Sequence, residues 1–174
     1  RDDQWQQQVL QQYEDSLRTM VDLCRTADVP LILVNLGSNL RDCPPFKSEH
    51  KPGLTSQAES EWQTYFDRAS KTEANDLPQA LQQYQQAESI DSDYALLSYR
   101  IARCLDRLGR MDEAKDYFLH TKDLDICPLR MLETTHSVVK SVAKETKTPL
   151  VDVRRLLEAQ SPQGIPGNHW YLDH

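Results

Sequence analysis

The chain has 174 residues, and its 20 Lys and Arg against 27 Asp and Glu give a formal net charge of −7. Nucleic acids and anionic membranes both attract clustered Lys and Arg, so the acidic balance argues against either as a partner. No apolar run reaches the roughly 18 residues of a membrane-spanning helix. The length fits one globular domain, or one domain with a small insertion.

The cysteines are scattered, and none has the C-x-x-C spacing of a zinc site, so neither a metal nor another cofactor is expected. They are Cys24, Cys43, Cys104 and Cys127. Cys43 and Cys127 both precede proline and flank the central helical region. A bridge between them and two separate thiols are both compatible with this pattern, which leaves the cellular compartment open.

The first predicted element is a helix over residues 3–28, because apolar residues recur there at spacings of three and four. Pro30 ends it. Residues 31–36 are nearly all apolar, which is typical of a strand buried on both faces in a parallel sheet. A long loop follows from residue 37 to about 53, where prolines and glycines interrupt any regular pattern.

Residues 55–124 are predicted to be helical and contain a repeat of 34 residues. The matched pairs are Tyr65 with Tyr99, Leu77 with Met111, Ala80 with Ala114, Tyr84 with Phe118, Ile90 with Leu124, and Asp91 with Asp125. Two helices per 34 residues is the period of tetratricopeptide repeats. The second copy is the more regular, since Gly109 stands at its turn, where the first copy has Asn75.

The last third predicts a helix from Leu129 to about Lys147, a strand over 150–153, a short helix, and a loop over 161–167. Without the repeats, a β-α-β unit remains, with a right-handed crossover between parallel strands. Two strands alone cannot form a sheet buried on both faces. Together with the abrupt start of the sequence without Met, this predicts that the chain is part of a longer protein.

The run Ser38-Asn39-Leu40-Arg41-Asp42-Cys43-Pro44-Pro45-Phe46, with residues 29–34, 125–130 and 164–174, resembles bacterial SGNH/GDSL-type hydrolases that carry a tetratricopeptide insertion. The resemblance implies a flavodoxin-like α/β/α domain with a nucleophilic serine in a Gly-Asp-Ser or Gly-Gly-Ser turn, a Gly-x-Asn oxyanion segment and a C-terminal Asp-x-x-His pair. Asp173 matches the acid of that pair. No such serine turn precedes the first strand, and the matching histidine would lie two positions past His174.

The predicted fold is therefore predominantly α with an α/β remnant, two repeat hairpins being inserted in a partial flavodoxin-like domain. The expected divisions are 1–54 for the first part of the α/β domain, 55–127 for the repeats and 128–174 for the return. By resemblance the chain is the middle portion of such a hydrolase and is catalytically incomplete. We expect the isolated chain to self-associate through exposed strand edges, or to rearrange its strand segments.

Asn39, Arg41, Arg130 and Asp173 are predicted to gather at strand ends as a candidate active-site loop. A nucleophilic Ser38 is a weaker hypothesis, since the residues around it fit an ordinary turn. The acidic residues of 112–113 and 123–125 are interpreted as helix-start charge and solvated faces. The histidines lack ligand spacing, the best cluster being His169 with Asp173 and His174, and those in helices are expected to be exposed.

The first helices of such repeats line a concave face that typically holds a peptide. Here that face would present Tyr65, Tyr99, Arg103 and Asp106, and Tyr and Arg are common interface anchors. The preferred hypothesis is a protein-interaction module, with a protein or peptide as partner, attached to the incomplete hydrolase-like piece. Two alternatives stay open. The repeats are a structural lid, or the chain is part of an active serine esterase whose nucleophile and histidine lie outside it.

Overall fold

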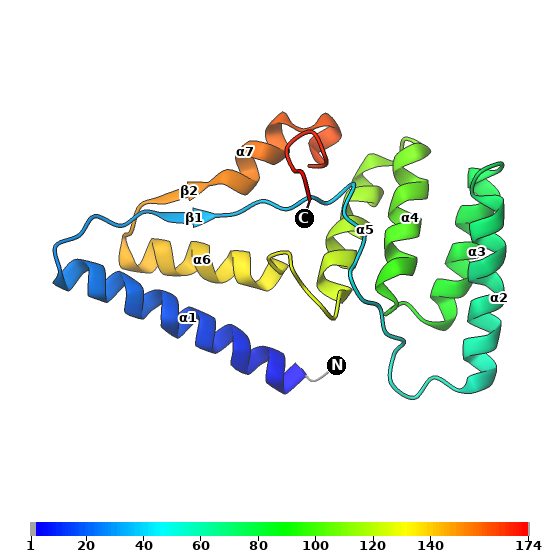
Figure 1. Cartoon of the computed structure of the whole chain (residues 1–174), viewed down its shortest axis with the longest axis horizontal. Coiled ribbons are helices and arrows are strands. Elements are labelled where there is room, and N and C mark those ends of the chain that lie inside the picture. The colour runs from blue at the N-terminus through cyan, green and yellow to red at the C-terminus, as the bar shows by residue number, and fades with distance from the viewer. Residues whose placement is uncertain (1–2, 174) are drawn as a thin grey trace. The chain divides into compact units, whose positions relative to one another are not determined.

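The structure is a computed structural model that describes residues 3–173 (Figure 1). It is predominantly helical with one small parallel sheet, as the sequence predicts. The chain forms two compact units. The α/β unit comprises the chain up to Ser38 together with Met131–Gly164, and the repeat unit comprises Asn39–Arg130 together with the chain from Ile165 onward. The expected divisions at 54 and 127 stay a prediction.

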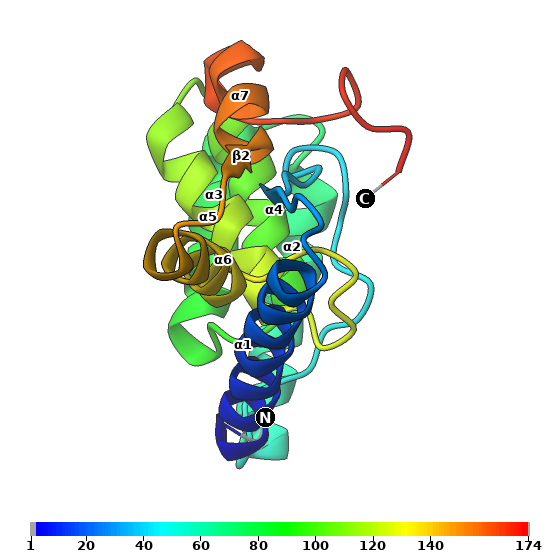
Figure 2. The same cartoon turned by 90° about the vertical axis from the view of Figure 1, so that its left-hand side faces the viewer.

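The α/β unit consists of α1 (Asp3–Thr26), β1 (Leu33–Asn35), α6 (Glu133–Thr146), β2 (Leu150–Asp152), α7 (Val153–Gln160) and the short 3-10 helix η1 (Pro162–Gly164). The strands pair in parallel, with Leu33 opposite Leu150, as a β-α-β unit requires. Helix α6 packs against α1 and against β1 (Figure 1 and Figure 2). The core between them consists of apolar residues of α1, β1 and α6, such as Val21 and Val142.

Three predicted bounds in this unit are corrected. Helix α1 ends at Thr26 rather than at 28, because Asp28 adopts a left-handed conformation and the Val29 amide returns to the Cys24 carbonyl, closing the helix end. Strand β1 has three residues, not six, and Val34 is 43% exposed, so the strand is not buried on both faces. Helix α6 begins at Glu133, several residues after Leu129, which lies in the preceding loop.

The repeat unit contains two helical hairpins, α2 (Ser56–Thr72) with α3 (Leu77–Ile90) and α4 (Ala95–Arg107) with α5 (Met111–Leu124). The 34-residue period holds in three dimensions, since α3 and α5 begin and end at matched positions of the two copies. Ala80 and Ala114 are fully buried at equivalent places, which lets the helices approach closely. Gly109 has a positive φ of 78° in the turn between α4 and α5, a conformation that glycine adopts without strain.

The large side chains of the repeats form one core. Trp62, Tyr84 and Phe118 are almost completely buried in it. Leu40 and Ile165, which lie outside the helices, belong to the same cluster. The segments before and after the repeats are therefore built into the repeat core, and this fixes the loops that carry the candidate site.

All four cysteines are free thiols, so the bridge between Cys43 and Cys127 is absent; Cys43 is buried, whereas Cys127 is exposed. Across residues 3–173, none of the helices is both long and apolar enough to cross a membrane.

Candidate functional site

A loop segment, residues 39–47, is bound to α4 by its main chain. It bends at Arg41 and Asp42, where the Asp42 N–H donates to Asn39 Oδ1 at 3.0 Å. The Tyr99 hydroxyl and the Arg103 guanidinium both donate to the Arg41 carbonyl, at 3.0 and 3.1 Å. Tyr99 and Arg103 are four residues apart and so lie on the same side of the helix. Burial raises the pKa of the Tyr99 phenol, so this hydroxyl stays protonated and remains a donor.

Two ion pairs join the side chains of the segment to the same helix. Arg41 binds Asp106 at 3.1 Å, and Asp42 binds Arg103 at 3.0 Å. The Arg41 and Asp106 side chains are only 17% and 14% exposed, so solvent screens this pair less than it screens a surface ion pair. Arg41 and Asp42 therefore each pair with a side chain of α4.

Asp125, the residue after α5, holds the end of the segment. Its carboxylate accepts hydrogen bonds from the main-chain N–H groups of Phe46 at 2.7 Å and of Lys47 and Cys127 at 3.0 Å each. Arg130, itself buried, donates to the carbonyls of Asn39 at 3.1 Å and Cys43 at 2.9 Å. Asp125 is 6% exposed, so its interpretation as part of a solvated acidic face is wrong.

The C-terminal stretch lies against the start of the same segment. The Asn39 side-chain amide donates to the Asp173 carbonyl at 2.7 Å and to Asn168 Oδ1 at 3.0 Å. The Asn168 main-chain N–H donates to the Asp42 carboxylate at 2.9 Å. A side chain at Gly167 would overlap that carboxylate, so this close approach requires glycine.

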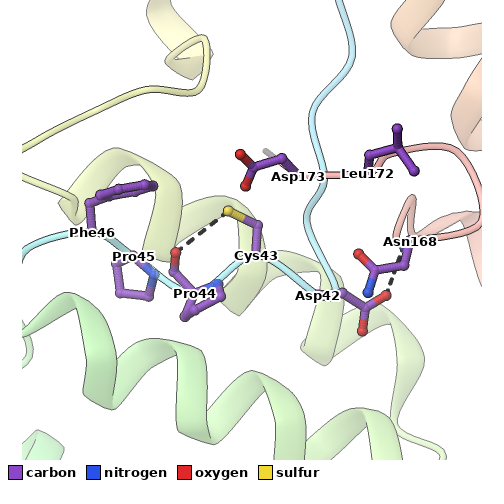
Figure 3. A pocket seen from close by; sticks show the side chains of 8 residues that line it. All are labelled: Asp42, Cys43, Pro44, Pro45, Phe46, Asn168, Leu172 and Asp173. Atoms are coloured by element: carbon purple, nitrogen blue, oxygen red, sulfur yellow. Dashed lines mark hydrogen bonds between the residues drawn. The ribbon is translucent and has the colours of Figure 1, made fainter.

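These two loops form the walls of a pocket of about 460 Å³. Its lining residues are Asp42, Cys43, Pro44, Pro45, Phe46, Asn168, Leu172 and Asp173. Figure 3 shows Asp42 and Asn168 hydrogen-bonded on one side, with the Cys43 sulfur and the Asp173 carboxylate between them and Phe46. Phe46 and Leu172 are exposed, so the pocket combines carboxylates with apolar surface.

The Cys43 thiol is not an activated nucleophile. Burial raises its pKa, and the nearby Arg130 only partly offsets that effect. A thiol with a raised pKa stays protonated near neutral pH and reacts slowly. In the described part of the chain, no group of three or more His, Cys, Asp or Glu side chains could hold a metal ion.

The structure thus brings together most of the residues that sequence analysis singles out. Hydrogen bonds join Asn39 to Asp173 and Arg130, and Arg41 to Tyr99, Arg103 and Asp106. Tyr65 is different, since it is half-buried against the repeat core on α2. Ser38 is 7% exposed, and His174 lies outside the described residues.

A second polar cluster, missed from the sequence, lies in the α/β unit. The buried Asn35 side chain accepts from His136 Nδ1 at 2.7 Å and donates to Asp152 at 2.8 Å. Lys140 pairs with Asp152 at 3.2 Å. His136 is 3% exposed, which corrects the expectation of an exposed helical histidine. Burial would raise the Asp152 pKa, but hydrogen bonds from Asn35, the Arg155 main chain and Lys140 outweigh it, so that pKa is lowered.

Comparison with known proteins finds a family model that matches part of the repeat unit. Residues 71–122 match the tetratricopeptide repeat family. The matched range runs from the end of α2 to α5, and it contains the part in which the 34-residue period is most regular. The repeat therefore supplies a helical module of the protein-interaction type. No curated protein and no solved structure matches the chain.

Proposed function

We propose that the chain is a tetratricopeptide-type protein-interaction module attached to a catalytically incomplete piece of an SGNH-hydrolase-like α/β domain. The observation that carries the proposal is the use of α4. Tyr99 and Arg103 both bind the main-chain carbonyl of Arg41, a group that every peptide can offer. The family match over residues 71–122 supports the same role.

The test is an array of synthetic nonapeptides probed with the purified chain. Binding through α4 should be lost in the Arg103→Ala variant, because that guanidinium both donates to a main-chain carbonyl and pairs with a carboxylate. The matched control is Arg68→Ala, an exposed arginine on α2 whose loss should leave the array pattern unchanged. The array is also probed with the Arg41→Ala, Asp42→Ala variant, which weakens the segment that occupies α4 in the structure. If neither form of the chain binds a peptide, or if the Arg103→Ala and Arg68→Ala variants behave alike, α4 is not a partner-binding surface.

A second candidate function is part of an active serine esterase. The contact between Asn39 and Asp173 at the pocket favours it, because the resemblance matches Asp173 to the triad acid and Asn39 belongs to the predicted active-site loop. In that function Asp173 would orient a histidine that activates a serine, both lying outside this chain. The Asn39 amide, which now donates to the Asp173 carbonyl and to Asn168, would donate to the oxyanion.

Labelling with a serine-directed fluorophosphonate tests the esterase function. We expect no labelling of the 174-residue chain, and labelling of a longer protein containing it that falls strongly with Asp173→Asn. Absence of labelling in both proteins would exclude the esterase function and leave the interaction module as the proposed function. Labelling of the short chain that disappears with Ser38→Ala would instead identify Ser38 as the nucleophile.

A further inference from the structure

Residues 39–47 occupy the repeat unit in the manner of a bound peptide. Carbonyl groups along the segment accept hydrogen bonds from Tyr99, Arg103 and Arg130, and N–H groups near its end donate to Asp125. We call these four residues, together with Asp106, the recognition surface. Main-chain contacts of this kind give affinity without regard to sequence.

Specificity comes from three side-chain features of the segment. The basic Arg41 fits Asp106, and the acidic Asp42 fits Arg103. Reversing the order of the two charges would place like charges against each other at both positions.

The third feature is the pair Pro44-Pro45, which lies between two main-chain anchor points. Arg130 holds the Cys43 carbonyl on one side, and Asp125 holds the Phe46 amide on the other. Proline has no N–H, and it keeps its own φ and the preceding residue extended. The two prolines therefore span the gap between the anchors without leaving a donor unsatisfied, and they reduce the conformational entropy lost on binding.

We infer that the recognition surface binds peptides in which a basic and an acidic residue are followed, after one residue, by two prolines and an aromatic residue, and that residues 41–46 are its resident copy. This inference rests on the proposed interaction function and names the partner chemistry. An external peptide of this type has to displace the resident segment. Because the resident segment also lines the pocket, partner binding and an intact pocket exclude each other.

The test uses a fluorescein-labelled synthetic peptide of residues 39–49, with serine in place of the cysteine, and fluorescence anisotropy. The Arg41→Ala, Asp42→Ala double variant weakens the resident segment and leaves the recognition surface intact. We expect it to bind the peptide at least tenfold more tightly than the unmodified chain does. Adding Arg103→Ala should abolish this gain, whereas adding Arg68→Ala should not change it.

A peptide with its Arg and Asp exchanged provides the specificity control, and it should bind at least tenfold more weakly. Circular dichroism establishes that the variants are folded, with Arg41→Ala alone as the milder form. Hydrogen exchange of residues 39–47 should be faster in the double variant.

Equal binding of the two peptides, or failure of a folded variant to bind either, would overturn the inference. If array peptides of other sequences still bind through Arg103, the proposed function stands while this inference fails. If nothing binds, both fail.

Discussion

Replacing Gly167 by alanine should loosen the contact between the C-terminal stretch and the pocket loop. The new Cβ would overlap the Asp42 carboxylate, which accepts from the Asn168 main chain at 2.9 Å and from Arg103 at 3.0 Å. A hydrogen bond to a charged group contributes about 1.5 kcal/mol or more, and a partly exposed ion pair adds about 0.5 kcal/mol. We therefore expect Gly167→Ala to lower the free energy of unfolding by about 2 kcal/mol.

Urea denaturation followed by circular dichroism measures this change, and a double-mutant cycle with Asp42→Ala assigns it. Without the carboxylate, the closest remaining atom is Arg41 Cβ at 3.3 Å, which a small shift relieves, so Gly167→Ala should cost less than about 1 kcal/mol in that background. Hydrogen exchange should accelerate at residues 41–46 in the single variant. A cost that is the same in both backgrounds would refute the reasoning, since the clash would then not involve Asp42.

Other substitutions and conditions test further parts of the structure. Asp125→Ala should destabilise the chain by about 3 kcal/mol in urea denaturation, because three main-chain donors lose a buried charged acceptor; a cost under 1 kcal/mol would contradict this. The Asp152 pKa is lowered in the folded chain, so its contribution is present above about pH 4 and is lost as the pH falls through the folded pKa. Thermal unfolding of Asp152→Asn should therefore depend less on pH in that acid range, and an unchanged dependence would count against the cluster. Iodoacetamide at pH 8 should modify the exposed Cys127 while sparing Cys104, whose pKa burial raises to about 11, and Cys43. Mass spectrometry identifies which cysteines are modified first, and this difference in reactivity should disappear in urea.

The repeat hairpins could be predicted because their signal is local. Positions 34 residues apart carry side chains of matching size, and α3 and α5 begin and end where that pairing places them. The length of β1 could not be predicted in the same way. An apolar run shows that a strand is favourable, but hydrogen bonding to β2 decides how many residues form it, and β2 has only three.

The candidate site also combines features that local sequence patterns predict with features that depend on long-range contacts. Hydrogen bonds bring Asn39, Arg130 and Asp173 together, but not at strand ends as the sequence predicts, because Arg130 precedes α6 and Asp173 follows η1. The burial of Asp125 could not be predicted from its residue type and its position, since an aspartate after a helix is usually solvated. Its signal was the repeat pairing with Asp91, which is also buried and binds the same loop through His50 and the Lys51 amide.

The bond between Arg130 and the Asn39 carbonyl bears on the order of folding. Strands β1 and β2 pair residues 117 positions apart, such as Asn35 and Asp152, and closing so long a loop early would be slow. The hairpins form from neighbouring segments, and once formed they tie position 39 to position 130. The loop that strand pairing must close is then roughly a quarter as long. The entropic cost of closing it falls by about 1 kcal/mol, at about 0.6 kcal/mol for each halving of loop length. We therefore expect the repeats to fold before the sheet in most molecules.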